Sequence, residues 1–397
     1  MAERKFRLPG IHELNKEQEE VRALPLDGQY LIIGGPGTGK SVVALLRVKK
    51  IISNKSGYQF LVYNKLLKRA SEQLMNGSFN IESWNRWFSK MYYDLTQQEL
   101  PKKPSNNSKW KKTDWEQVGD NLTLVETDSL DKQYLVIDEG QDMPQDFYQV
   151  LTNLGFENFF VVADQNQQII EGEHSNRVQI MDSLNIDEED VIELKSNYRN
   201  YLAVAKLARH FYTGNPASPP PDLPVKRSLS AIRPILFEYT DRQFQKIINR
   251  ILKNTDRNPN KLTGIITPNN RVRKRYFNAL MRTEIELENN KPNIATYCYG
   301  GDSDIDFSKG GIMVINAQSC KGLEFDIVFL ADINKFIMNQ QHIDMMKRRF
   351  YVIIARAIEQ VIMLKQYGEH CPVEEILPKD ESLLMRKGKS YNSRLNP

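Results

Sequence analysis

The sequence predicts an α/β protein with two domains, each built on a parallel β-sheet. Short runs rich in β-branched and aromatic residues alternate with helical or loop segments along most of the 397 residues. A glycine-rich turn joins the first of these runs to a helix. The hydrophobic content of 40% allows substantial cores, and the length fits two or three domains.

The first set of predicted strands comprises residues 30–33, 60–63, 134–137, 159–163 and 191–194. A polar stretch at about 75–131 interrupts the alternation, and we interpret it as a small insertion into the first domain. Its segment 101–112 combines five lysines with Trp110. That composition suits backbone phosphates and stacked bases, and it suits a solvated loop equally well.

The second set of predicted strands comprises residues 235–238, 262–267, 312–315, 327–330 and 361–364, with helices at 271–281 and 344–357. The proline-rich segment 215–224 suits neither a helix nor a strand. We expect a first domain at 1–193, a second at 194–373 and a polar tail at 374–397. Residues 378–397 are expected to be unstructured or to dock on a partner.

The composition places the chain among cytoplasmic proteins. No stretch approaches the roughly 20 apolar residues of a membrane span, and residues 1–7 lack the apolar region of a secretory signal. Cys298, Cys320 and Cys371 lack the paired spacing of zinc or iron–sulfur sites, and fit reduced thiols. The net charge of +4 is compatible with a polyanionic partner without identifying one.

The most specific signal is the glycine-rich turn Gly34–Ser41, which matches the P-loop pattern G-x-x-x-x-G-K-[ST]. Its backbone N–H groups can converge on a phosphate at the positive end of the following helix. Lys40 can reach the β- and γ-phosphates, and the Ser41 hydroxyl can bind Mg²⁺. The turn therefore predicts ATP and Mg²⁺ as cofactors, bound by Gly35, Pro36, Gly37, Thr38, Gly39, Lys40 and Ser41.

Polar side chains follow two further strands at the edge where α/β sheets bind ligands. Asp138 and Glu139 come directly after residues 134–137. Asp138 would hold Mg²⁺ directly or through water, and Glu139 would polarise the attacking water. Asp164 and Gln167 follow residues 159–163, and the Gln167 amide can hydrogen-bond the γ-phosphate or that water.

The order of these motifs along the chain, together with further motifs downstream, resembles that of superfamily 1 helicases of the UvrD/Rep type. The resemblance covers almost the whole chain, through segments 14–18, 34–41, 136–142, 164–167, 194–199, 318–325 and 347–357. It implies two RecA-like P-loop motor domains that hydrolyse ATP in a cleft between them. It also implies 3′→5′ travel on single-stranded DNA.

The resemblance also implies roles for single residues. Gln18 would read the adenine edge, Tyr198 would stack on the base and Glu324 would bind the ribose. Arg199 would contact the γ-phosphate, and Arg356 would stabilise charge on the transferring phosphoryl group. Three residues would face single-stranded nucleic acid, namely Asn64, Lys65 and Trp84. For Trp84 a core position beside Trp87 is an equal alternative.

The sequence departs from the family pattern at four positions, which carry Ala163, Ile170, Gln318 and Ala355. Ile170 replaces an aromatic residue that commonly couples ATP state to the bound strand. The stretch between Arg199 and Gln318 also lacks the large insertion of full-length relatives. The chain therefore corresponds to a minimal two-domain motor.

These features lead to one expected function and two alternatives. We expect an ATP-dependent translocase or helicase on single-stranded nucleic acid, DNA rather than RNA. The first alternative is a nucleic-acid-sensing ATPase switch, or a subunit that serves a nuclease or effector in repair or phage defence and unwinds little itself. The second is a module that does not hydrolyse ATP, which the intact Lys40, Glu139 and Arg356 argue against.

Overall fold

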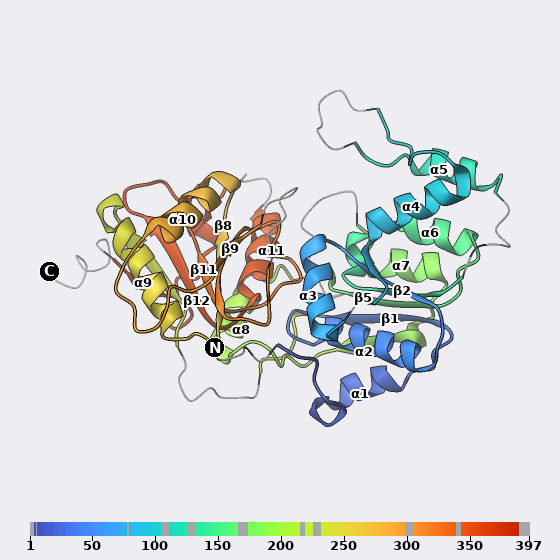
Figure 1. Cartoon of the computed structure of the whole chain (residues 1–397), viewed down its shortest axis with the longest axis horizontal. Coiled ribbons are helices and arrows are strands. Elements are labelled where there is room, and N and C mark those ends of the chain that lie inside the picture. The colour runs from blue at the N-terminus through green and yellow to red at the C-terminus, as the bar shows by residue number, and fades with distance from the viewer. Residues whose placement is uncertain are drawn as a thin grey trace. The chain divides into compact units, whose positions relative to one another are not determined.

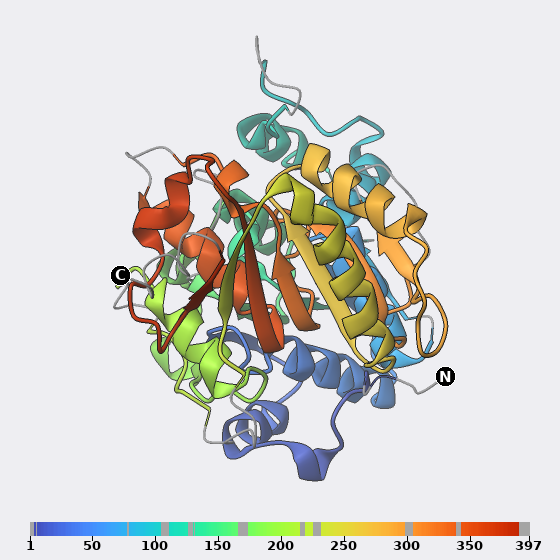
Figure 2. The same ribbon diagram turned by 90° about the vertical axis from the view of Figure 1, so that its left-hand side faces the viewer.

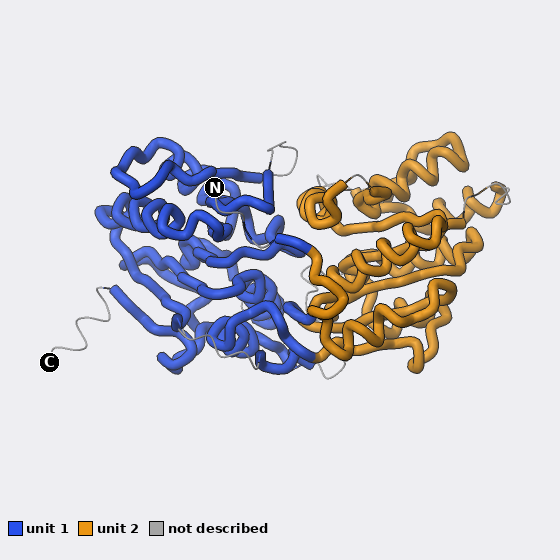
Figure 3. The backbone as a smooth tube through the Cα atoms, turned by 60° about the horizontal axis from the view of Figure 1, so that its bottom comes forward, with its two compact units in different colours: residues 1–7, 36–38, 196–397 blue, residues 8–35, 39–195 orange. Residues whose placement is uncertain are grey.

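The computed structural model shows two compact units (Figure 3). The N-terminal unit comprises residues 8–35 and 39–195, and the C-terminal unit comprises residues 1–7, 36–38 and 196–397. The structure describes residues 4, 6–77, 79–104, 111–125, 130, 132–165, 174–214, 219–224, 232–297, 305–338 and 343–388.

The described residues of the N-terminal unit form a six-stranded sheet whose paired strands are all parallel. The strand order is β3-β2-β4-β5-β1-β6. The strands are β1 (Gln29–Gly34), β2 (Tyr58–Val62), β3 (Ile81–Ser83), β4 (Tyr134–Ile137), β5 (Phe159–Ala163) and β6 (Val191–Leu194). Five of them confirm the predicted strands, and the three-residue strand β3 was not predicted.

Helices cover both faces of this sheet (Figure 1). They are α1 (Lys16–Ala23), α2 (Lys40–Ser53), α3 (Lys65–Met75), α4 (Trp84–Thr96), α5 (Trp115–Leu122), α6 (Gln145–Asn153) and α7 (Arg177–Leu184). Successive strand residues point to opposite faces. Leu31 and Ile33 therefore join the core under α4 to α7, whereas Ile32 joins the core under α1 to α3.

The stretch expected to be an insertion does not stand apart from this sheet. Strand β3 pairs with β2 through Ile81 and Phe60. Helices α4 and α5 bury Phe88 and Val118 in the same core as strand β4. Large apolar side chains spaced along these helices explain the difference, because their burial outweighs the polar composition around them.

The described residues of the C-terminal unit form a seven-stranded parallel sheet of order β13-β7-β12-β11-β8-β10-β9. The strands are β7 (Ile235–Tyr239), β8 (Leu262–Thr267), β9 (Ile294–Thr296), β10 (Gly311–Asn316), β11 (Phe325–Leu330), β12 (Ala357–Gln366) and β13 (Met385–Lys387). Five of these confirm predicted strands. Two parallel α/β domains are therefore present, as the sequence predicts.

Four helices flank this sheet in the described part of the chain: α8 (Leu202–His210), α9 (Phe244–Asp256), α10 (Asn270–Arg282) and α11 (Ile343–Ile354). Figure 2 shows α9 and α10, in yellow and orange, on one face, with α8 and α11 on the other. Ile251 of α9 and Tyr276 of α10 pack in one core with Ile265 of β8.

Two expectations for this unit need correction. The helix predicted over 344–357 ends at Ile354, because Ala357 pairs with Phe325 and starts β12. The stretch 378–397 is not wholly unstructured, since β13 pairs with β7 at the edge of the sheet. Within the described residues, no helix has the length and apolarity to cross a membrane.

Candidate functional site

The P-loop lies between the end of β1 and the start of α2. Gly37 and Gly39 have φ angles of 84° and 90°, in the left-handed region that glycine adopts without strain. A Cβ atom at Gly39 would lie 2.3 Å from Gln18 Nε2, and one at Gly37 would lie 2.3 Å from Asn197 Oδ1. Both positions therefore require glycine for backbone conformation and for space.

The Lys40 ammonium lies over this loop. Its Nζ donates to the carbonyl of Gly35 at 2.8 Å and lies 3.4 Å from Asp164 Oδ2. Lys40 is 8% exposed and Asp164 is fully buried. A buried cation held by one carbonyl and one carboxylate can exchange these partners for phosphate oxygens.

Asp138 is buried directly after β4. Its Oδ1 accepts a hydrogen bond from the Glu139 N–H at 2.9 Å, and its Oδ2 has no hydrogen bond of normal geometry among the described residues. Burial raises the pKa of Asp138 to about 6, and the Glu139 carboxylate adds to the rise, whereas Ser41 and Lys40 lower it. A buried carboxylate oxygen beside a hydroxyl fits a divalent cation such as Mg²⁺.

Glu139 has a left-handed backbone with φ 57° and ψ 43°, which is costly for a residue with a side chain. Its Oε2 accepts a hydrogen bond from Gln141 Nε2 at 2.7 Å. Gln141 Oε1 in turn accepts one from the Asp164 N–H at 2.9 Å. Gln141 therefore joins the ends of β4 and β5 and fixes the Glu139 carboxylate.

Gln141 has a role that the sequence alone does not predict. The only signal was its place two residues after Glu139, which does not reveal a bond to the neighbouring strand. The structure thus brings together Lys40, Ser41, Asp138, Glu139 and Asp164. Gln167 and Ile170 lie outside the described residues, so the role of Gln167 stays a prediction.

Gln18 is 7% exposed and belongs to the first turn of α1. Its N–H donates to Asn15 Oδ1 at 2.7 Å, and its Oε1 accepts from the Asn15 N–H at 3.3 Å. This capping box places the Gln18 amide against Gly39 of the P-loop. Its contact with adenine stays a prediction.

In the C-terminal unit, the two residues expected to contact the γ-phosphate and the ribose contact each other. The Arg199 guanidinium forms an ion pair with the Glu324 carboxylate. Tyr198 is 53% exposed, and its N–H donates to the carbonyl of Gly37 at 2.9 Å. Arg356 is 3% exposed, and its Nε donates to the carbonyl of Val352 at 3.3 Å.

Two asparagines connect these segments through contacts that no local sequence pattern predicts. Asn197 Oδ1 accepts from the N–H groups of Arg199 and Asn200, each at 3.1 Å. The side chains of Asn197 and Asn200 bond to each other at 3.0 Å. Asn200 Nδ2 then donates to the carbonyls of Ala355 at 3.0 Å and Ala357 at 2.5 Å, which flank Arg356 in the chain.

The three residues expected to face nucleic acid differ in their surroundings. Asn64 caps α3 by accepting the Leu67 N–H at 2.8 Å, and Lys65 is exposed. Trp84 is half-buried and meets Phe147 edge-on, with ring centroids 5.3 Å apart. Trp84 thus packs against the core as a partly buried residue, and its contact with nucleic acid stays a prediction.

Comparison with known proteins gives one family match. Residues 18–173 match the family model described as an AAA domain. The match begins at Gln18 and includes the P-loop and the Asp138–Glu139 pair. The N-terminal unit therefore contains a P-loop NTPase domain, the class that its sheet and its loop define.

Among solved structures, this chain is similar to the C-terminal domain of a possible DNA helicase from Lactobacillus plantarum WCFS1. The identity is 16% and the TM-score 0.34, and the match covers 49% of this chain and all of that one. The comparison with curated proteins gives no match.

Proposed function

We propose that the protein is an ATP-dependent motor on single-stranded nucleic acid, a DNA translocase or helicase that travels 3′→5′ in the cytoplasm. The observation that carries the proposal is the P-loop between β1 and α2, with Lys40 and Ser41 close to the buried Asp138–Glu139 pair. The order of the helicase-like motifs along the chain supports the choice of a motor over other P-loop NTPases.

The residues of the N-terminal unit divide the work of hydrolysis. Asp138 Oδ2 and the Ser41 hydroxyl would hold Mg²⁺, which when bound offsets charge on the phosphates. Lys40 exchanges Asp164 and the Gly35 carbonyl for phosphate oxygens. Glu139 orients the attacking water and takes up its proton. The bond from Gln141 keeps that carboxylate in one orientation.

Residues of the C-terminal unit would contact the nucleotide as well. The exposed ring of Tyr198 offers a face for a purine. The Arg199–Glu324 ion pair would separate when ATP binds, so that Arg199 contacts the γ-phosphate and Glu324 accepts the ribose hydroxyls. Arg356, a cation already held by Val352, would stabilise charge on the transferring phosphoryl group.

The deciding experiment measures steady-state ATP hydrolysis without nucleic acid, with single-stranded DNA and with single-stranded RNA. Lys40→Ala serves as the blank, because loss of the ammonium removes phosphate binding. Stimulation by DNA of tenfold or more supports the motor and identifies its strand. Turnover that neither polymer changes would contradict it and favour the alternative of a switch or partner subunit.

Glu139→Gln tests the assignment of the base. The variant should bind ATP with unchanged affinity and lose hydrolysis by about 100-fold or more, because general-base catalysis contributes that much. Fluorescent-nucleotide titration and phosphate release measure the two properties. Glu157→Gln, an exposed glutamate after α6, is the matched control and should retain the wild-type rate. A Glu139→Gln rate equal to wild type would remove Glu139 from this role.

A further inference from the structure

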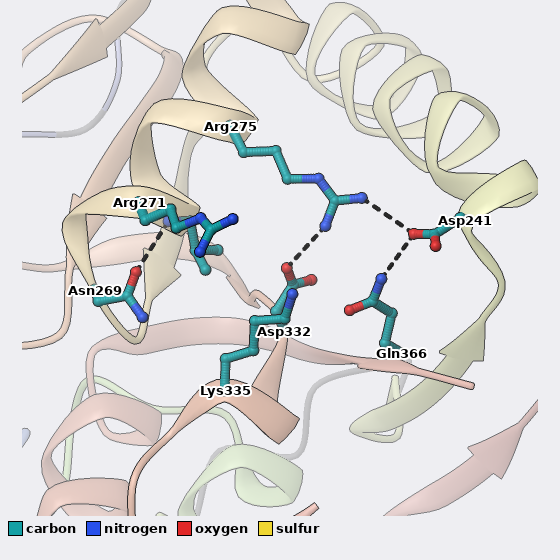
Figure 4. A pocket seen from close by; sticks show the side chains of 8 residues that line it. Asp241, Asn269, Arg271, Arg275, Asp332, Lys335 and Gln366 are labelled. Atoms are coloured by element: carbon teal, nitrogen blue, oxygen red, sulfur yellow. Dashed lines mark hydrogen bonds and ion pairs between the residues drawn. The ribbon is translucent and has the colours of Figure 1, made fainter. Parts of the chain in front are cut away.

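The C-terminal unit contains a pocket of about 570 Å³ at one edge of its sheet (Figure 4). Asp241, Asn269, Asp332 and Gln366 line it at or just after the carboxyl ends of β7, β8, β11 and β12. Glu324 and Arg356, by contrast, immediately precede β11 and β12. Because the sheet is parallel, the pocket and these two residues lie at opposite edges.

The strand connections favour a ligand site at this edge. From β8 the chain passes through α10 to β9, on the β10 side of the sheet. From neighbouring β11 it passes through α11 to β12, on the other side. Adjacent parallel strands whose connections leave in opposite directions create a crevice, and α/β proteins commonly bind ligands there.

The acidic groups of the pocket are already satisfied within the protein. Arg275 reaches Asp332 Oδ2 at 3.3 Å and Asp241 Oδ1 at 3.5 Å. Asp332 Oδ1 also accepts hydrogen bonds from Tyr239 at 2.5 Å and Tyr276 at 2.7 Å. Their hydroxyls remain donors, because burial and then the Asp332 charge raise the pKa of both tyrosines. These carboxylates therefore need no cation from outside.

Two cationic side chains of the pocket differ from these carboxylates in their contacts. Arg271, in the first turn of α10, and Lys335, after β11, are both exposed. Neither has an ion pair or hydrogen bond from its side chain within the described part of the chain. The positive end of α10 starts at Asn270, next to Arg271 in the chain. This side of the pocket is therefore suited to an anion.

Gln366 supplies an independent sign of a ligand. It is 8% exposed, and its Nε2 donates to Asp241 Oδ1 at 2.7 Å while its backbone N–H donates to Asn334 at 3.1 Å. Its Oε1 is buried and accepts no hydrogen bond from the described residues. In Figure 4 this oxygen points away from Asp241, toward the side of Asp332 and Lys335. A buried acceptor of this kind calls for a donor.

We propose that this pocket binds a small phosphate ester that also carries a hydroxyl or amino group, such as a nucleoside monophosphate. Arg271, Lys335 and the start of α10 contact the phosphate, whose three oxygens can accept from several donors at once. Gln366 Oε1 accepts from the sugar or the base. The volume exceeds that of a bare phosphate ion and falls in the range of ligand sites for small molecules. The proposal does not depend on the motor function.

Calorimetric titration of AMP into the full-length Lys40→Ala variant tests the site. AMP lacks the β- and γ-phosphates that the P-loop lysine would bind, so its binding there is minimised. We expect saturable binding to one site. Introducing Arg271→Ala and Lys335→Ala together into this variant should weaken AMP binding at least tenfold. Lys274→Ala, which removes an exposed cation of the same helix outside the pocket, should change the affinity less than twofold.

Gln366→Met distinguishes recognition of the whole ligand from attraction of charge alone. It should weaken AMP and ribose 5-phosphate at least fivefold and leave inorganic phosphate unchanged, with an unaltered melting temperature. No binding of AMP or ribose 5-phosphate at millimolar concentration would overturn the proposal. An AMP affinity that is unchanged in the variant with both Arg271→Ala and Lys335→Ala would also overturn it. A third contradicting result would be that thymidine oligonucleotides bind at this site and AMP does not.

Discussion

Glu139 and Asp332 share an uncommon position in the two units. Each is the second residue after the end of a parallel strand, and each has a left-handed backbone, with φ of 57° and 47°. For a residue with a side chain this conformation costs on the order of 1–2 kcal/mol. Hydrogen bonds from Gln141 to Glu139, and from Tyr239 and Tyr276 to Asp332, offset that cost. Both carboxylates are thereby held in place at the edge of their sheet where the strands end.

Asp138 gives a prediction on stability and pH. Folding raises its pKa from 3.8 to about 6, so the unfolded chain loses this proton at lower pH than the folded protein does. The stabilising effect of the protonated form is therefore present below about pH 4 and is lost as the pH rises toward 6. Without Mg²⁺, Asp138→Asn should raise the free energy of unfolding by about 1–3 kcal/mol at pH 7.5.

Urea denaturation in EDTA at several pH values measures this effect. The difference in the free energy of unfolding between Asp138→Asn and wild type should shrink toward zero near pH 4. Asp146→Asn, at an exposed acidic residue of α6, provides the comparison and should show no such trend. A difference that stays constant from pH 4 to 7.5 would contradict the assigned pKa.

The cysteines give a second prediction at this scale. Cys320 is fully buried and Cys371 is 8% exposed, and burial raises the pKa of each thiol to about 11. The thiolate is the reactive form, so both should be inert at pH 8. The test uses a Cys298→Ser variant, which retains only these two thiols. In the folded protein, Ellman's reagent should label fewer than one thiol in ten over an hour. After unfolding it should label both thiols. Rapid labelling of native protein would contradict this.

At the scale of elements, Asn200 connects two chain segments that are distant in sequence and should be sensitive to truncation. Asn200→Ala removes its bonds to the carbonyls of Ala355 and Ala357 and to Asn197. Buried groups left unsatisfied cost about 1–3 kcal/mol each, so we expect a loss of about 2–4 kcal/mol. ATP turnover should fall with it, because Arg356 lies between the two carbonyl residues.

Thermal unfolding and phosphate release measure these two effects. Asn278→Ala, an exposed asparagine of α10, is the matched change and should leave both within error of wild type. If Asn200→Ala lowered stability without affecting turnover, the bonds would matter for folding alone, and the link to Arg356 would be wrong.

The strands also show what sequence patterns can predict. Runs such as 159–163 and 262–267 are continuously apolar or β-branched and were placed correctly. The edge strands β3, β9 and β13 have three residues each, too few for a period to be recognised. Residues 355–357, Ala-Arg-Ala, favour a helix locally, and pairing with β11 overrides this preference at Ala357.

At the scale of the whole molecule, the sequence predicted two parallel α/β domains and the P-loop, because each follows from contiguous residues. The bonds among Asn200, Ala355 and Ala357 join residues more than 150 positions apart, and no local pattern encodes them. The same holds for the Arg199–Glu324 ion pair. The 570 Å³ pocket takes its walls from four separate strand ends and has no contiguous signature.

Strand β12 extends over ten residues from Ala357, next to Arg356, to Gln366 in the pocket wall, with one register irregularity against β11 between Ala357 and Gln360. At about 3.3 Å per residue it spans roughly 33 Å. Hydrogen bonds to β11 on one side and β7 on the other prevent it from sliding alone. A ligand at one end that altered affinity at the other would have to act on the sheet as a whole. Thermodynamic linkage would then make the effect reciprocal, with the same factor in both directions.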